Sequence, residues 1–134
     1  MWGLAQLGVY KRVPIDLPSI LIVDDDADIR EALIDVLTDH GYRALAVGNG
    51  REALDHLRLG ARPSLILLDA MMPVMDGLSF RREQLIDPEL RGLPVLLISA
   101  ASRTLDTSDL GLVGVMSKPI DLDRLLAVIA RHYG

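Results

Sequence analysis

The residues of this chain that could do chemistry share one kind of position, because each ends or directly follows a short aliphatic run. They are the acidic run Asp24-Asp25-Asp26, Asp69, Ser99 and Lys118. Taken singly, Asp and Ser at such positions most often cap helices or hold turns. Taken together, they supply several carboxylates, one hydroxyl and one ammonium group.

Carboxylates gathered in one place would need a cation. Two unit charges 4 Å apart repel by about 1 kcal/mol in water and by several-fold more at a partly buried site. Carboxylate oxygens, waters and a phosphate oxygen are the ligands that Mg²⁺ prefers. An ammonium group could then contact a phosphoryl oxygen, and a hydroxyl could donate to another. With the charge neutralised in this way, a carboxylate can attack phosphorus and form an aspartyl phosphate.

The aliphatic runs that precede these residues are typical of strands buried on both faces of a parallel sheet. They are SILIV at 19–23, ALAV at 44–47, SLILL at 64–68, PVLLIS at 94–99 and VGVM at 113–116. Segments of helical periodicity alternate with them, which predicts βα units. Because right-handed crossovers bring the carboxyl ends of all the strands to one edge, the polar residues should meet there.

Four segments have the apolar spacing and the end signals of amphipathic helices. They are 27–42, 49–60, 76–87 and 121–132. The predicted N-caps are Asp26 or Asp28, Asn49, Asp76 and Asp121, and the predicted stops are Gly41 and Gly60. The segment 103–112 is rich in Thr, Ser, Asp and Gly, so at most a short helix is expected there.

Composition narrows the possible functions. A chain of 134 residues has room for one domain, and half of its residues are hydrophobic. The absence of cysteine excludes disulfides and thiolate sites and fits a cytoplasmic location. A net charge of -5 disfavours direct binding to nucleic acid, and no apolar run is long enough to span a membrane. We interpret residues 1–18 as an N-terminal extension that need not be ordered and 19–134 as the domain.

Four motifs in this order carry a resemblance to a known family: LIVDDDADIREAL, LILLDAMMPVMDG, PVLLISA and VMSKP. From Ser19 to Tyr133 the chain resembles the response-regulator receiver domain of bacterial two-component signalling. The resemblance implies an α/β fold with a doubly wound, five-stranded parallel sheet in the flavodoxin-like order 2-1-3-4-5. The fourth helix of that fold would fall on 103–112 and would be short or irregular.

The resemblance also implies a role for each acidic position. Asp69 corresponds to the phosphoacceptor, because it ends a strand four residues before Pro73 in the MPxMDG segment. Asp24 and Asp25 correspond to the acidic pair that holds Mg²⁺. The backbone carbonyl of Met71, together with Asp69, would complete the protein's share of the metal ligands.

Two further positions would contact the phosphoryl group. Ser99 stands where the family carries Thr or Ser, and Lys118 stands at its Lys-Pro step. Receivers hold that peptide bond cis, so the resemblance predicts a cis bond before Pro119. Cis bonds occur at only about 5–6% of X-Pro positions, which makes this a sharp expectation.

The sequence departs from the family in one region. Val115 stands where receivers usually carry an aromatic residue that turns inward on phosphorylation, and Ile120 stands where many have Phe. The stretch between Ser99 and Lys118 is also shorter than the family's. We therefore expect intact phosphorylation chemistry with an unusual readout.

As a receiver, the chain would be a signalling protein that modifies itself rather than an enzyme acting on other substrates. Its expected partners are a histidine kinase or histidine phosphotransfer protein, and an effector or a second copy bound through the face of the fourth helix and fifth strand. It would act alone or as a piece of a longer protein.

Other functions fit less well. A receiver that binds partners without phosphorylation remains an alternative. A Mg²⁺-dependent phosphohydrolase with an Asp nucleophile would need Thr or Val where Asp28 stands. A nucleotide or flavin binder would need a Gly-rich turn after the first strand.

Overall fold

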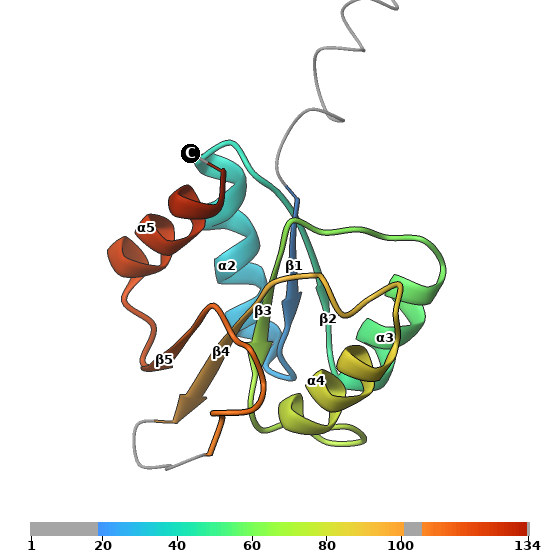
Figure 1. Cartoon of the computed structure of the whole chain (residues 1–134). Helices are drawn as coiled ribbons and strands as arrows, with labels where there is room; N and C mark the ends of the chain where they lie inside the picture. Colours follow the sequence, from blue (N-terminus) through green and yellow to red (C-terminus); the bar gives the residue numbers. More distant parts are fainter. Residues whose placement is uncertain (1–18, 101–105, 134) are drawn as a thin grey trace, which may run out of the picture.

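Five aliphatic runs form strands, and each strand pairs in parallel with its neighbours. The computed structural model describes residues 19–100 and 106–133 (Figure 1). The strands are β1 (Ser19–Val23), β2 (Arg43–Val47), β3 (Leu65–Asp69), β4 (Val95–Ala100) and β5 (Gly114–Lys118). Their order in the sheet is β2-β1-β3-β4-β5, which confirms the predicted fold class. The observed strand ends lie within two residues of the predicted ones.

Burial separates the inner strands from the two edge strands. Every residue of β3 is buried, and so are nearly all residues of β1 and β4. On the edge strands, Leu45 of β2 is 47% exposed and Val115 of β5 is 44% exposed. The expectation that all five strands are buried on both faces was therefore wrong for β2 and β5. An edge strand has a neighbour on one side only, so its side chains are covered less completely.

Helices cover both faces of the sheet (Figure 1). They are α2 (Ala27–Asp39), α3 (Gly50–Arg58), α4 (Gly77–Ile86) and α5 (Leu122–Tyr133). Figure 1 shows α2 and α5 on one face, and α3 and α4 on the other. Each face of the sheet therefore encloses its own part of the core.

The helix caps follow the sequence signals. Of the two candidates for α2, Asp26 is the N-cap and accepts hydrogen bonds from the amides of Asp28 and Ile29. Asn49 and Asp76 cap α3 and α4 as predicted. At the start of α5, the side chain of Asp121 accepts a bond from the amide of Arg124.

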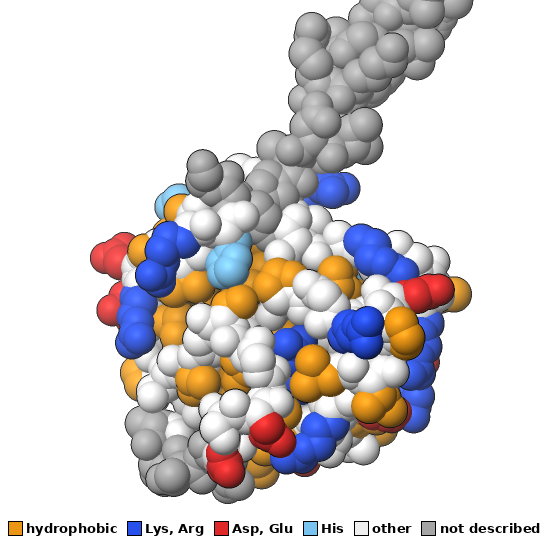
Figure 2. All heavy atoms as spheres, viewed as in Figure 1, with side chains coloured by type: hydrophobic (Ala, Val, Ile, Leu, Met, Phe, Trp, Pro, Cys, Tyr) orange, Lys and Arg blue, Asp and Glu red, His pale blue; other side chains and the backbone are white. Residues whose placement is uncertain are grey.

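The core consists of two hydrophobic clusters, one on each side of the sheet. The first joins the sheet to α2 and α5 and includes Ile22, Leu37, Leu67 and Ile129. The second joins it to α3 and α4 and includes Leu54, Leu68, Phe80 and Leu97. Burying one such side chain contributes about 1.5–3 kcal/mol, so these clusters dominate the stability that holds the strand ends in place. Figure 2 shows that further hydrophobic side chains reach the surface of the viewed face among basic ones.

The connection from β4 to β5 contains no helix in its described part, residues 106–113. Residues 101–105, which include the start of the predicted short helix, lie outside the described residues. The predicted N-terminal extension at 1–18 also lies outside them. No helix in the described ranges is long and apolar enough to cross a membrane.

Candidate functional site

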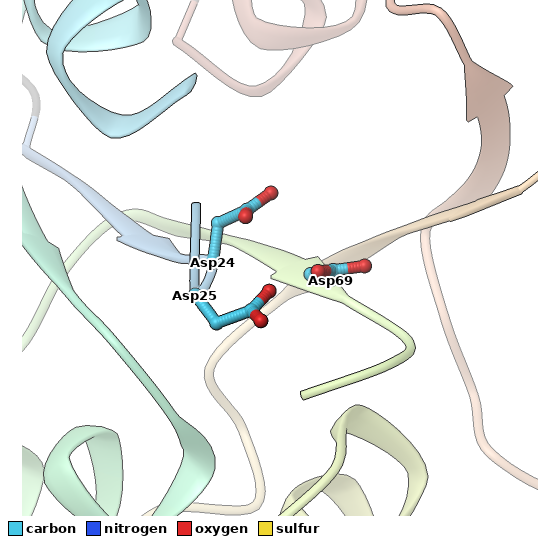
Figure 3. A group of neighbouring side chains, drawn as sticks. All are labelled: Asp24, Asp25 and Asp69. Carbon is cyan, nitrogen blue, oxygen red and sulfur yellow. The ribbon is translucent and has the colours of Figure 1, made fainter. Parts of the chain in front are cut away.

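Three carboxylates meet at the carboxyl edge of the sheet. Asp24 and Asp25 follow β1, and Asp69 ends the adjacent strand β3. One carboxylate oxygen from each lies within 4.8 Å of the others (Figure 3). Asp24 and Asp69 are buried, at 3% and 5% exposure, whereas Asp25 is exposed. The expected convergence at this edge is confirmed for these three residues.

Lys118 joins two of the carboxylates. Its Nζ lies 3.5 Å from Asp24 Oδ2 and 3.4 Å from Asp69 Oδ1. The side chain of Lys118 is 29% exposed, so the ammonium group lies at the mouth of the site and not in the core. One positive charge therefore faces two buried negative charges and a third that is open to water.

The electrostatics of the site leave an excess of negative charge. Burial raises the pKa of Asp69, and the charge of Asp24 raises it further; the Met71 amide and Lys118 act in the opposite direction without cancelling the effect. Burial alone would lower the pKa of Lys118, but the charges of Asp24 and Asp69 outweigh it and raise that pKa. A cation bound among these oxygens would relieve the remaining repulsion.

The loop after β3 fixes the backbone around Asp69. The Met71 amide donates to Asp69 Oδ1 at 3.3 Å, and the Gly77 amide donates to the Ala70 carbonyl at 3.0 Å. A Cβ at Gly77 would lie 2.3 Å from the backbone oxygen of Asp69, so only glycine allows this close approach. Helix α4 therefore begins in direct contact with the backbone of Asp69.

The turn after β1 is fixed by a residue that the sequence analysis did not single out. Arg30 of α2 donates from Nη1 to the Asp24 carbonyl at 2.8 Å. The Asp26 amide donates to Asp24 Oδ1 at 2.8 Å, and the Asp24 amide donates to the Val47 carbonyl at 3.1 Å. Arg30 lies one helical turn after the Asp26 cap, and this spacing is the only sequence signal that could have identified it.

Ser99 lies on the strand between Asp69 and Lys118. It is buried at 5% exposure and directly follows Ile98, the register partner of Asp69 on β3. In the pairing of β4 with β5, Ala100 is the partner of Lys118, so Ser99 is also one residue from that pair. The strand order places Ser99 at the same edge as the carboxylates, and its contact with a phosphoryl group stays a prediction.

Two further expectations concern the backbone and the metal ligands. The Lys118-Pro119 peptide bond is cis, as predicted. Met71 is 49% exposed and lies on the loop that borders the site, but the role of its carbonyl as a metal ligand stays a prediction. The three oxygen donors, with Asp25 open to solvent, fit a divalent cation that keeps some of its waters.

Comparison with known proteins agrees with this geometry. A family model described as response regulator receiver domain matches residues 20–130. Sporulation initiation phosphotransferase F of Bacillus subtilis is 32% identical over 115 residues, which cover 85% of this chain and 92% of that protein. The response regulator MprA of Mycolicibacterium vanbaalenii is 39% identical over 111 residues, which cover 81% of this chain and only 47% of the relative.

Solved structures share the fold. The chemotaxis response regulator CheY4 of Vibrio cholerae has a TM-score of 0.78 at 28% identity, covering 87% of this chain and 98% of that one. The signal receiver domain of a histidine kinase from Syntrophus aciditrophicus has a TM-score of 0.79 at 36% identity, covering 86% and 89%. With the family model spanning most of its length, this chain belongs to the response regulator receiver domain family.

Proposed function

We propose that the chain accepts a phosphoryl group on Asp69 in the presence of Mg²⁺ and signals by altered binding to a partner. The observation that carries the proposal is the position of the Lys118 ammonium group, within 3.5 Å of both Asp24 and Asp69. A lysine held only by one surface carboxylate would fit a structural ion pair. A lysine facing two buried carboxylates beside a third fits a site for a doubly charged anion and its cation.

The reaction transfers a phosphoryl group from a nitrogen or oxygen atom of the donor to a carboxylate oxygen of Asp69. An Asp69 carboxylate oxygen forms a bond to phosphorus while the bond from phosphorus to the donor atom breaks, and the electron pair of that bond leaves with the donor. The Lys118 ammonium group contacts one oxygen of the transferring group, and the Ser99 hydroxyl donates to another. Asp24, Asp25, Asp69 and the Met71 carbonyl would hold Mg²⁺, and the bound ion would supply positive charge that neutralises these oxygens.

Membership of the receiver family supports a histidine kinase or a histidine phosphotransfer protein as the phosphoryl donor. Such a donor would place the protein in the cytoplasm. Because the phosphoryl group would be transferred to Asp69 of the chain itself, we class the chain as a signalling protein. We place the readout on the β4–β5 connection and the exposed side of β5, where an effector or a second copy would bind.

One specific feature favours the alternative, a receiver that works without phosphorylation. Val115 lies on β5 where an aromatic switch residue would stand, and it is 44% exposed. A valine at this position cannot exchange between inward and outward ring orientations. The alternative predicts that binding to partners does not depend on modification of Asp69.

Mass spectrometry after treatment with acetyl phosphate and Mg²⁺ tests the proposal. We expect one added phosphoryl group, and borohydride trapping should locate it at Asp69 because this carboxylate faces Lys118 at 3.4 Å. The variant Asp69→Ala, which has no carboxylate at this position, should lose at least about 90% of the label. Asp35→Asn, which changes an exposed acid on α2, is the matched control and should be labelled normally.

Label that persists in Asp69→Ala, or that is absent from the unsubstituted chain, would contradict the proposal. Loss of label in the Asp35→Asn control would show that the assay reports surface charge rather than the site.

A further inference from the structure

Arg81 and Gln84 are buried polar residues that the phosphoacceptor site does not use. Both lie on α4, where Arg81 is 4% exposed and Gln84 is fully buried. Within the described ranges, no carboxylate forms an ion pair with the Arg81 guanidinium. Burying a charged group costs desolvation free energy unless its donors make hydrogen bonds. The contacts of the Arg81 guanidinium group therefore need an explanation.

The guanidinium group is bound by neutral acceptors from two segments. Nε donates to the Leu110 carbonyl at 2.9 Å, and Nη2 donates to the Gly111 carbonyl at 3.1 Å. Nη1 donates to Gln84 Oε1 at 2.8 Å and to the Leu93 carbonyl at 3.2 Å. One side chain therefore connects α4 both to the chain before β4 and to the chain before β5.

Gln84 completes the arrangement on the side of β4. Its Nε2 donates to the carbonyls of Leu90 and Leu93 at 2.9 and 3.0 Å. Its oxygen is the acceptor that orients the Arg81 fork. The hydrogen bonds of Gln84 with Arg81 and with the chain before β4 are buried. Helix α4 and the start of β4 are therefore firmly connected, and Arg81 extends from α4 to the second segment.

The second segment is residues 106–113, which we call the β4–β5 strap. It contains no helix, although a crossover between parallel strands usually does. Leu110 is its anchor in the core, at 1% exposure, and the Val113 amide donates to the Val95 carbonyl at 2.9 Å. With so little secondary structure of its own, the strap depends on side chains from α4 for its position.

We propose that Arg81 is a latch that holds the β4–β5 strap on α4 and allows the strap to open as a unit while the rest of the domain stays folded. Opening would return the guanidinium group to water and recover its hydration, which offsets part of the lost bonding. A contact between apolar groups of the same burial would have no such compensation. The bonds of Arg81 therefore hold the strap less strongly than their number suggests, and the burial of Leu110 adds to them.

The latch connects two segments that each border the phosphoacceptor site. A regulatory role for it rests on the proposed function. Helix α4 begins at Gly77 against the backbone of Asp69. The strap leads into β5, which ends in Lys118, and its Val113 amide bonds to the Val95 carbonyl on β4, the strand that carries Ser99. A partner that binds the open strap would thus act on the segment between two of the proposed phosphoryl contacts.

Hydrogen exchange on the full, unphosphorylated chain tests the latch. Arg81→Met removes the donors and keeps a long apolar side chain, so amide exchange within 106–113 should accelerate on the order of tenfold or more. Exchange in β1 and β3 should stay within about twofold of the unsubstituted protein. Arg82→Met is the matched control, because it removes the same charge from an exposed neighbouring position and should leave the strap unchanged.

Two results would overturn the inference. One is strap exchange in Arg81→Met equal to that of the unsubstituted chain. The other is an equal acceleration in the strap and in β3, which would mean a loss of global stability. Should Arg81→Met fail to fold, Arg81→Lys retains the charge and should give intermediate strap exchange; unchanged exchange there would overturn the latch.

Failure of the proposed function gives a different pattern. If acetyl phosphate leaves Asp69 unmodified, the phosphoacceptor role is lost. The exchange measurement needs no phosphoryl group, so it still decides whether Arg81 holds the strap.

Discussion

At the scale of single residues, Asp69 is a buried carboxylate that faces another carboxylate, and such a group opposes folding when it is charged. Burial and the charge of Asp24 raise its pKa. The folded protein therefore binds this proton more tightly than the unfolded chain does. The stabilisation from Asp69 is complete below the unfolded-state pKa and is lost as the pH rises through the folded-state pKa.

Substitution of this residue should consequently stabilise the metal-free protein. Asp69→Asn keeps the shape of the side chain and removes the charge, so we expect a higher Tm than that of the unsubstituted chain at about pH 7 in EDTA and no gain at about pH 3. Thermal unfolding followed by circular dichroism measures both. An equal gain at the two pH values would show that packing, and not charge, explains the difference.

At the scale of elements, the loop between β3 and α4 contains a strained residue. Val74 has a φ of 68°, in the left-handed region that β-branched residues rarely adopt, and the Met75 amide donates to the Pro73 carbonyl at 2.7 Å across it. Its side chain is 82% exposed, so little packing offsets the strain. The Gly50 amide of α3 donates to the Met75 carbonyl at 3.0 Å, and this contact helps to hold the loop in this shape.

Relief of this strain should stabilise the protein without changing the core. Val74→Asn places a residue that tolerates the left-handed conformation, and we expect the free energy of unfolding to rise by about 1 kcal/mol. Urea denaturation measures the change. Val74→Ala, which keeps most of the backbone cost, should gain less; a loss of stability in Val74→Asn would mean that the Val74 side chain makes a needed contact.

Strands and helix caps were predictable from the sequence because their signals are local. The run SILIV predicts a strand at 19–23, and β1 occupies Ser19–Val23. Asn49 and Asp76 are caps because their side chains reach amides three residues later. The exposure of Leu45 was not predictable in this way, since it depends on which strand lies at the edge of the sheet.

The candidate site was predictable in part. Asp24, Asp25, Asp69 and Lys118 could be brought together from the sequence because parallel strands share one carboxyl edge. The buried contacts of Arg81, outside this site, were not predictable, because its partner Leu110 is 29 residues away and an arginine on a helix is usually exposed. The left-handed conformation of Val74 was missed for a similar reason, since sequence patterns assign it to Gly or Asn.

At the scale of the whole molecule, the residues that stabilise the fold and the residues of the candidate site lie on different parts of the sheet. The two hydrophobic clusters lie on its faces, whereas the carboxylates lie at its carboxyl edge, where Figure 3 shows Asp24 and Asp25 beside Asp69. The chain spans about half or less of the length of several relatives it matches. In these relatives the matched region is therefore one part of a longer protein.

Amide NMR with Mg²⁺ and beryllofluoride, a mimic of the phosphoryl group, tests the central claim most directly. We expect shifts at Asp25, Met71 and Lys118 that extend into the β4–β5 strap, because the strap leads directly into β5, which ends in Lys118. Asp69→Asn should show none of the beryllofluoride-dependent shifts. Unchanged spectra of the unsubstituted chain, or the same shifts in Asp69→Asn, would contradict a phosphoryl group held on Asp69.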